Sequence, residues 1–513
     1  MSKRINIINF VRESDPRYDA KDALFYTVEK HIELEKKYNF KSTYLLQYDA
    51  MISPRYQALF AKEKTDKMEI GLWFEVVKQL CDKVGIAWQG REGYDWDWHA
   101  NPTYLTAYTF EEKKKLIDEA MDYYFRLYGA YPKSVGCWIM DSQSMEYMQK
   151  EYGVVAFCLL REQYGTDGYT VWGGYYEGGY YPSIHNAFMP AQTEDLRLKA
   201  PVFRMLGVDL IYNYYEKFMN GQFDENGVPS WILTMEPVSI AGFNEKFVKT
   251  YFDSMLYNED MGFSYVQLGQ ENSMGWANAE KGLNLQFEYL KEKEGQFVIE
   301  TLSETGMWFK ETYNSTPATA RAVLSDWKNN NNQSVWYNCK NYRANVFSNG
   351  EKLYFRDIYL FEERIKDKHI ETPCKEEVIA YQDSLPVIDG CFWSNEEKWA
   401  GIYIDGCTKI DKVYKDGDTF CVAVSGEKKV ELRFSEDKIE ICGDDEFAIR
   451  FVYDEALLED KPKFLCDRID YIKNGFEYSV SLNKGSAENK SIRSNDKEIV
   501  FSFVKQFEIK SCL

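Results

Sequence analysis

The sequence predicts an α/β fold in which a parallel (β/α) domain is followed by an antiparallel β-sandwich domain. Through residues 1–327, short apolar segments that suit buried strands alternate with amphipathic helical patterns. Beyond the polar run at 328–333, apolar and polar residues alternate by twos between turn signals, which is typical of antiparallel strands. We therefore divide the chain into an N-terminal domain, 1–327, and a C-terminal domain, 328–513.

Composition narrows the range of partners. The chain has 513 residues, more than one hydrophobic core normally serves, in line with two domains. A net charge of −20 argues against binding nucleic acid or an anionic membrane by charge. The 39 tyrosines and 13 tryptophans have flat faces with polar edges that suit stacking on sugars, although most such residues fill cores.

The chain has the features expected of a cytoplasmic protein without a cofactor. It shows neither a signal-peptide pattern at its N-terminus nor a run of the ~20 apolar residues that a membrane helix needs. Eleven scattered cysteines fit free thiols in a reducing compartment. The four histidines lack metal-ligand spacing, and phosphate-binding, dinucleotide and nucleophile-elbow motifs are absent. Carboxylates are therefore the main reagents available.

The first domain opens with a strand at 4–10, and a helix with a charged outer face follows at 23–37. Strands at 42–47 and 68–74 come next. A strongly amphipathic helix at 109–128 has Thr109 as its expected cap and acidic residues in its first turn. Further strands are expected at 134–140, 154–160, 232–235 and 262–268, with a helix near 145–152 and a closing helix at 318–327.

Acidic side chains stand where several of these strands end. Glu75 follows the strand at 68–74, Glu236 follows 232–235, and Glu271 follows 262–268. Catalytic groups collect at the carboxyl ends of parallel strands. We therefore expect acidic side chains from separate segments to meet in one aromatic-walled cavity, with no transition metal among them.

Asp141 also stands at a strand end, directly behind the small and apolar residues 134–140 and close to Trp138. It is either a site carboxylate or the N-cap of the following helix, because Asp is a preferred N-cap residue. The sequence around it leaves both interpretations open.

Two loops carry an unusual density of aromatic residues. The loop at 88–102, WQGREGYDWDWHANP, predicts a pocket wall with Asp95, Asp97 and His99 as polar edges, or a loop that is pinned by its tryptophans. The segment at 165–190 is rich in Gly and Tyr and includes Trp172. So long a loop without strands or helices is usually functional, and its composition favours a ligand surface.

The strands of the first domain resemble the glycoside hydrolase/deacetylase superfamily, whose members have a distorted (β/α)7 barrel. Residues 69–74, EIGLWF, are similar to the third-strand motif of its polysaccharide deacetylases, and residues 131–136, YPKSVG, resemble the segment leading into their fourth strand. Two histidines near that motif bind the deacetylase metal, whereas the matching positions here hold Trp73 and Val77. The resemblance thus implies the fold without the metal site.

The metal-independent family-57 glycoside hydrolases of this superfamily are the better comparison. Their fourth strand ends in a Gly-x-Trp-x-x-Glu pattern, and residues 136–141, GCWIMD, match its spacing with Asp in place of Glu. Residues 268–272, LGQEN, are similar in position to the acidic run of a later strand. The resemblance implies Asp141 as nucleophile and Glu271 as acid/base, with three substitutes for Glu271 left open: Glu75, Glu236 and Glu304.

On this resemblance we expect a (β/α)7-type barrel followed by a β-sandwich, and a metal-independent glycoside hydrolase that acts on a small glycoside or short oligosaccharide. Retaining glycosidases hold two carboxyl groups about 5 Å apart, one ionised and one protonated. Two alternatives remain: a metal-dependent deacetylase or other hydrolase that recruits His99 or His185, and a non-catalytic carbohydrate-binding protein. The side chains expected to contact the sugar are Trp73, Glu75, Asp95, Asp97, His99, Trp138, Trp172, Glu236 and Trp276.

Overall fold

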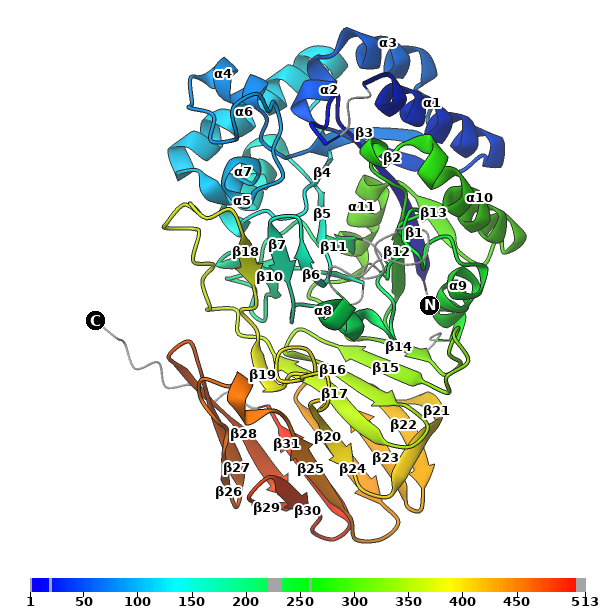
Figure 1. The fold of residues 1–513 in the computed structure, drawn as a ribbon, viewed down its shortest axis with the longest axis vertical. Coiled ribbons are helices and arrows are strands. Elements are labelled where there is room, and N and C mark those ends of the chain that lie inside the picture. The colour runs from blue at the N-terminus through cyan, green and yellow to red at the C-terminus, as the bar shows by residue number, and fades with distance from the viewer. Residues whose placement is uncertain are drawn as a thin grey trace.

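The structure is a computed structural model that describes residues 2–17, 21–176, 178–205, 207–219, 233–257 and 261–503. Its N-terminal half is built on a parallel sheet with the strand order β12, β1, β2, β3, β4, β5, β11 (Figure 1). Each strand pairs in parallel with the next, which confirms the predicted parallel (β/α) architecture. The bounds are β1 (Lys3–Val11), β2 (Ser42–Leu46), β3 (Met68–Trp73), β4 (Ser134–Gly136), β5 (Ala156–Leu160), β11 (Val202–Met205) and β12 (Ser264–Leu268), with β13 (Val298–Glu300) also beside β1.

Helices surround this sheet (Figure 1). The predicted amphipathic helix is α6 (Phe110–Tyr128), and Thr109 forms the expected capping box with Glu112. It ends at Gly129, whose φ of 72° lies in the left-handed region that glycine adopts without strain. The other helices are α1 (Lys21–Tyr38), α2 (Tyr48–Ile52), α3 (Pro54–Glu63), α4 (Lys78–Val84), α5 (Ala100–Thr103), α7 (Ser142–Tyr152), α8 (Glu216–Met219), α9 (Glu245–Tyr257), α10 (Trp276–Glu292) and α11 (Leu302–Thr312).

The C-terminal half packs two antiparallel sheets face to face, as the alternation by twos predicted. Tyr337 and Phe355 of one sheet contact Phe434 of the other, with ring centroids 5.4 and 6.2 Å apart. One sheet contains β14 (Thr319–Val323), β15 (Gln333–Asn338), β16 (Tyr342–Ser348), β17 (Leu353–Leu360), β19 (Leu385–Ile388), β20 (Gly401–Ile404), β25 (Ala448–Val452), β29 (Ser486–Glu488) and β30 (Ser491–Arg493). The other contains β21 (Cys407–Asp416), β22 (Thr419–Gly426), β23 (Lys429–Phe434), β24 (Lys438–Gly443), β26 (Lys463–Leu465), β27 (Arg468–Lys473), β28 (Phe476–Lys484) and β31 (Glu498–Ser502).

Several predicted elements differ from the structure. The segment at 318–327 is not a helix, because β14 within it pairs antiparallel with β15. The division of the chain at 327/328 stays a prediction, and the antiparallel sheet already begins at β14. The strand predicted at 134–140 ends at Gly136. Of the strand predicted at 232–235, residue 232 lies outside the described residues and Thr234 forms an isolated bridge to Val208.

The segment at 165–190, predicted to lack strands and helices, contains short strands. β6 (Gln163–Thr166) and β7 (Tyr169–Val171) form a hairpin with Asp167 and Gly168 at its turn. Further along lie β8 (Gly179–Tyr180), β9 (Pro182–Ser183) and β10 (Asn186–Pro190). The prediction was wrong because these strands find their partners elsewhere in the chain: β8 pairs with β11, and β7 pairs with a strand of the C-terminal half.

The two halves of the chain meet through a buried polar and aromatic interface. The ring of Tyr176 stacks on that of Trp336 with centroids 3.5 Å apart and planes nearly parallel, at 1°. Arg343, fully buried on β16, forms ion pairs with Glu162 of the N-terminal half and with Asp357 of its own sheet. Because a buried charge is costly unless it is paired, this interface ties the two halves together.

Candidate functional site

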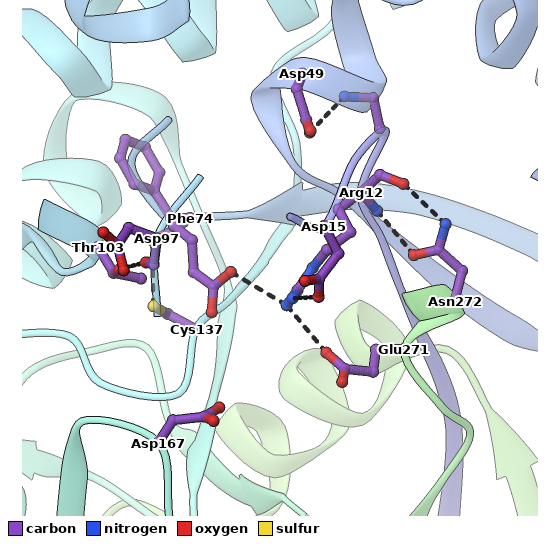
Figure 2. A network of polar contacts seen from close by, with 12 residues as sticks. Arg12, Asp15, Asp49, Phe74, Asp97, Thr103, Cys137, Asp167, Glu271 and Asn272 are labelled. Atoms are coloured by element: carbon purple, nitrogen blue, oxygen red, sulfur yellow. Dashed lines mark hydrogen bonds and ion pairs between the residues drawn. The ribbon is translucent and has the colours of Figure 1, made fainter. Parts of the chain in front are cut away.

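A buried arginine lies at the carboxyl end of the barrel strands. Arg12 follows β1, and its Nη2 lies 3.2 Å from Glu75 Oε2 and 3.0 Å from Glu271 Oε2. Its Nη1 lies 3.3 Å from Asp15 Oδ2. Figure 2 shows the ion pair between the guanidinium group and Glu271 as a dashed line, with Asp15 drawn beside the guanidinium group. One guanidinium therefore gathers carboxylates from three separate segments of the chain.

Strand pairing sets the position of these groups. Glu75 comes two residues after β3, where the backbone N–H of Phe74 donates to Gly136 O. Glu271 follows β12 and forms a parallel bridge with Phe10 of β1. Asn272 then accepts the backbone N–H of Arg12 and donates to its carbonyl, at 3.0 and 2.8 Å. Arg12 and Glu271 are thus held in register by backbone contacts as well as by their charges.

A second arginine lies at the more exposed side of this group. Arg17 donates to Asp15 and forms an ion pair with Asp167 at 3.2 Å. The guanidinium carbons of Arg12 and Arg17 lie 4.1 and 5.1 Å from the ring centroid of Trp96, within the range of cation–π contacts. Trp96 belongs to the loop at 88–102, so this loop packs an aromatic ring against both guanidinium groups.

Glu236 is the remaining acidic member. It accepts a hydrogen bond from Gln270 Nε2 at 2.9 Å, and Gln270 directly precedes Glu271. Burial, together with the nearby negative charge of Glu271, raises the pKa of Glu236 to about 7. We call this set the carboxylate cluster: Asp15, Glu75, Asp167, Glu236 and Glu271, with Arg12 and Arg17.

The other carboxyl groups of the cluster respond to the same causes. Burial raises the pKa of Glu75 to about 7, although Arg12 acts in the opposite direction. Burial also raises the pKa of Asp167, again against the effect of Arg17. At Asp15, by contrast, the effect of burial is outweighed by the hydrogen bonds from Arg17 and the charges of Arg12 and Arg17 taken together, so its pKa is lowered. The cluster thus combines carboxyl groups that favour the charged form with others that favour the protonated form.

Asp141 lies in a different environment from the cluster. It is the N-cap of α7, where its side chain accepts the backbone N–H of Ser144 at 2.9 Å and the Ser144 hydroxyl at 2.8 Å. Lys113 Nζ, also buried, lies 3.1 Å from Asp141 Oδ2. Of the two interpretations left open by the sequence, the structure bears out the N-cap. We do not carry Asp141 forward as the nucleophile, because both carboxylate oxygens are engaged within the protein core.

Most of the predicted aromatic contacts pack in cores. Trp73 and Trp138 are buried against Phe10, with ring centroids 4.2 and 5.2 Å from it. Trp172 is buried edge-on against Tyr214. Trp276 opens α10 and contacts the ring of His31. These positions leave their predicted role in sugar binding without support.

The three polar side chains predicted to border a pocket in the loop at 88–102 lie in different environments. Asp97 is buried and accepts two hydrogen bonds from the Arg91 guanidinium, each 2.8 Å long. Asp95 is exposed, and His99 lies 3.7 Å from Asp97. Asp97 therefore shapes the loop itself. Glu304, one of the substitutes considered for Glu271, closes the capping box of α11.

The structure adds four cluster residues that sequence reasoning did not select: Arg12, Asp15, Arg17 and Asp167. The first three follow β1 in the run RESDPR, where alternating charges at a strand end were a usable signal. Asp167 lies in an Asp-Gly pair, which indicated a hairpin turn but not a site. Its proximity to Arg17 depends on contacts 150 residues apart in the chain.

The described residues contain no group of three or more His, Cys, Asp or Glu side chains placed to hold a metal ion. Within the same ranges, no helix is both long and apolar enough to cross a bilayer.

Comparison with known proteins gives a match at the level of fold. Neither a family model nor a curated protein sequence matches this chain. A solved structure from Parabacteroides distasonis, described as a glycoside hydrolase/deacetylase, matches with a TM-score of 0.51 at 13% identity, over 77% of this chain and 95% of that one.

More distant matches include two enzymes from Thermococcus species. A GH57 branching enzyme of Thermococcus kodakaraensis has a TM-score of 0.31 at 11% identity, over 61% of this chain and 72% of that one. A 4-alpha-glucanotransferase of Thermococcus litoralis has a TM-score of 0.30 at 9% identity, over 98% of both chains. The Parabacteroides match shows a likeness of fold: this chain folds in the same way as that glycoside hydrolase/deacetylase structure.

Proposed function

We propose that this chain is a glycoside hydrolase in which Glu271 and Glu236 form the catalytic pair. The observation that carries the proposal is the contrast between these two neighbouring groups. Glu271 forms an ion pair with Arg12 at 3.0 Å, whereas Glu236 accepts a hydrogen bond from the neutral amide of Gln270 and has a pKa raised to about 7. Glycosidases need one ionised and one protonated carboxyl group beside the scissile bond.

Each group has a defined task in this proposal. Glu236 donates its proton to the glycosidic oxygen as the bond to the anomeric carbon breaks, so that the leaving group departs as an alcohol. Glu271 either attacks the anomeric carbon directly or removes a proton from an attacking water molecule. Arg12 places a positive charge beside Glu271 and fixes its orientation. Glu75 forms an ion pair with the same guanidinium nitrogen and so helps to hold Arg12 in place.

The burial of the pair favours a small substrate. Relative exposure is 5% for Glu271 and 7% for Glu236, and 2% for Glu75 behind them. A polymer passing through an open cleft needs acids that are accessible along a groove, whereas a terminal sugar can enter a nearly closed site. We therefore propose a small glycoside or short oligosaccharide as substrate.

The test is a screen of 4-nitrophenyl glycosides and short oligosaccharides, with the anomer of the first product followed by NMR. We expect turnover of at least one glycoside, and a loss of several orders of magnitude in Glu271→Gln because covalent or base assistance disappears. Glu304→Gln is a matched control, since that carboxylate caps α11. Near-normal turnover in Glu271→Gln would refute the assignment.

A further inference from the structure

A segment of the C-terminal half reaches back to the barrel. Residues 361–384, which we call the strap, connect β17 to β19, and these two strands pair with each other in one antiparallel sheet. Between them the chain leaves the sheet and extends β18 (Ile379–Tyr381) along the barrel side of the molecule, beside β7 (Figure 1). Both ends of the strap are therefore anchored in the C-terminal half while its middle contacts the N-terminal half.

Backbone hydrogen bonds join the strap to the loops that border the carboxylate cluster. The N–H of Ile379 donates to Gly168 O at 2.8 Å, and the N–H of Ala100 donates to Glu377 O at 2.8 Å. In the register of the parallel pair, Ile379 lies opposite Tyr169. The strap thus binds the β6–β7 hairpin on one side and the end of the aromatic loop on the other.

The hairpin presents Asp167 to the cluster. Asp167 has a φ of 44°, in the left-handed region, and its carboxylate pairs with Arg17 at 3.2 Å. Figure 2 shows this carboxylate pointing toward Glu271 and Arg12. Because Arg17 also binds Asp15, a displaced hairpin alters the charges around Arg12.

Gly168 marks the point where the three segments meet. A Cβ atom on this residue would lie 2.6 Å from Glu377 O, 2.9 Å from Ala100 N and 3.1 Å from Trp98 O. All three are backbone atoms, which cannot turn aside as a flexible side chain does. Hairpin, aromatic loop and strap are therefore packed too closely for any side chain at this position.

The strap is also fixed internally. The Tyr381 hydroxyl donates to Asp367 Oδ2 at 3.0 Å, and the Asp367 carboxylate accepts the N–H of His369 at 2.8 Å. The N–H of Asp367 itself donates to His185 O in the barrel half. These contacts make the strap a defined support rather than a loose connection.

We infer that the strap is a positioning element of the active site: the C-terminal half holds the Asp167 hairpin and the aromatic loop in place against the carboxylate cluster. This inference rests on the glycoside hydrolase function proposed above. It assigns the C-terminal half a positioning role in catalysis, which the backbone of residues 377–381 exerts through the hairpin and the aromatic loop, apart from any role in stability.

The experiment compares Gly168→Ala with Gly426→Ala in the full chain. A Cβ on Gly426, at the end of β22, would also meet a carbonyl oxygen and a backbone nitrogen, at 2.4 and 3.1 Å, but inside the C-terminal half. For a glycoside that the wild type cleaves, we expect kcat to fall about tenfold or more in Gly168→Ala, because displacements of about 1 Å can cost up to about 100-fold. Gly426→Ala is expected to keep wild-type kcat per folded molecule.

Amide hydrogen exchange gives a readout that does not depend on activity. Gly168→Ala is expected to speed exchange in the hairpin, 163–171, and in the strap, 377–381. Ile379→Pro removes the N–H that donates to Gly168 O and is expected to speed exchange in the hairpin. When it is combined with Gly168→Ala, the double variant is expected to lose little more kcat than Gly168→Ala alone, because both substitutions break the same contact.

The outcomes separate this inference from the proposed function. Faster hairpin exchange with wild-type kcat would overturn the positioning role, as would unchanged exchange in Ile379→Pro. Lower kcat with faster hairpin exchange, absent in Gly426→Ala, supports it. If the wild type cleaves no glycoside, the proposed function fails and with it the catalytic part of the inference, whereas the mechanical link between strap and hairpin is still decided by the exchange data.

Discussion

The Arg12 guanidinium lies 3.0 Å from the Glu271 carboxylate, and the side-chain amide of Asn272, the residue that follows Glu271, hydrogen-bonds to the backbone N–H and carbonyl of Arg12. The segments that follow two adjacent strands, β1 and β12, are thereby linked by charge and by side-chain-to-backbone hydrogen bonds. A carboxylate held this way keeps its orientation without help from substrate, which is the preorganisation that electrostatic catalysis needs.

Removal of the Arg12 charge is expected to destabilise the protein strongly. Arg12→Met leaves Asp15, Glu75 and Glu271 without their common buried partner, and breaking a buried pair costs about 3–5 kcal/mol. Urea unfolding at pH 7 measures the loss. Arg126→Met removes the exposed pair with Glu119 and is expected to cost less than about 1 kcal/mol. Equal losses in the two variants would contradict the central role of Arg12.

Activity is expected to fall as the pH rises through about 7. The proposed acid Glu236, with its pKa raised to about 7, must be protonated to act, so kcat/KM declines above that pH. Glu236→Gln is expected to keep turnover only of an activated aryl glycoside, whose leaving group needs no proton, and its residual turnover of other glycosides is expected to lack this alkaline decline. If the decline persists in Glu236→Gln but vanishes in Glu75→Gln, Glu75 is the acid instead.

Asp141→Asn is expected to reduce stability without affecting catalysis. The variant keeps an N-cap side chain for α7 but leaves the buried Lys113 ammonium without its carboxylate. We expect a loss of about 3–5 kcal/mol, and partial recovery when Lys113→Met is added. The kcat of the folded fraction should stay within a few-fold of wild type. A collapse of kcat at unchanged stability would restore Asp141 as the nucleophile.

Chelation is expected to leave activity unchanged. In the proposed mechanism the positive charge between the carboxylates comes from Arg12, which lies 3.0 to 3.3 Å from Asp15, Glu75 and Glu271. Dialysis against EDTA followed by assay with 4-nitrophenyl glycosides measures this. Activity that disappears with EDTA and returns with Zn²⁺ would favour a metal-dependent hydrolase.

Glu35 is expected to make the protein less stable as the pH rises. Burial raises its pKa to about 7 from an ordinary value of 4.5, even though Ser42, Tyr44 and Asn9 donate hydrogen bonds to it. Between pH 4.5 and about pH 7, Glu35 is protonated in the folded state but ionised in the unfolded state. The contribution of Glu35 to the free energy of unfolding is therefore complete below pH 4.5 and is lost as the pH rises through about 7. Urea unfolding across this window should show a shallower decline in Glu35→Gln. Glu33→Gln, exposed on the same helix, should show the wild-type slope.

Local patterns were enough to predict much of the fold. The capping box at Thr109, the buried strands and the acidic residues behind β3 and β12 all follow from short-range chemistry, and they led to Glu75 and Glu271. The sequence pattern places Glu236 at the end of a strand at 232–235. Within the described residues this segment forms only an isolated bridge at Thr234, yet the Glu236 carboxyl group does lie near Glu271 in the cluster.

Long-range partners account for what the sequence could not predict. Asp141 was preferred for its spacing to Trp138, whereas Lys113, which pairs with it, lies on another helix. Arg12 had no visible role until residues 15, 75 and 271 were brought together by the parallel sheet. The segment at 318–327 has an ambiguous pattern, and pairing with β15 makes part of it a strand.

The stacked rings of Tyr176 and Trp336 determine whether the two halves of the chain can be produced separately. A protein truncated after residue 327 would expose the ring of Tyr176 to solvent and leave Glu162 without its ion-pair partner Arg343. Such a fragment would tend to aggregate instead of folding into an active N-terminal half. The N-terminal half therefore depends on the C-terminal half to cover these side chains.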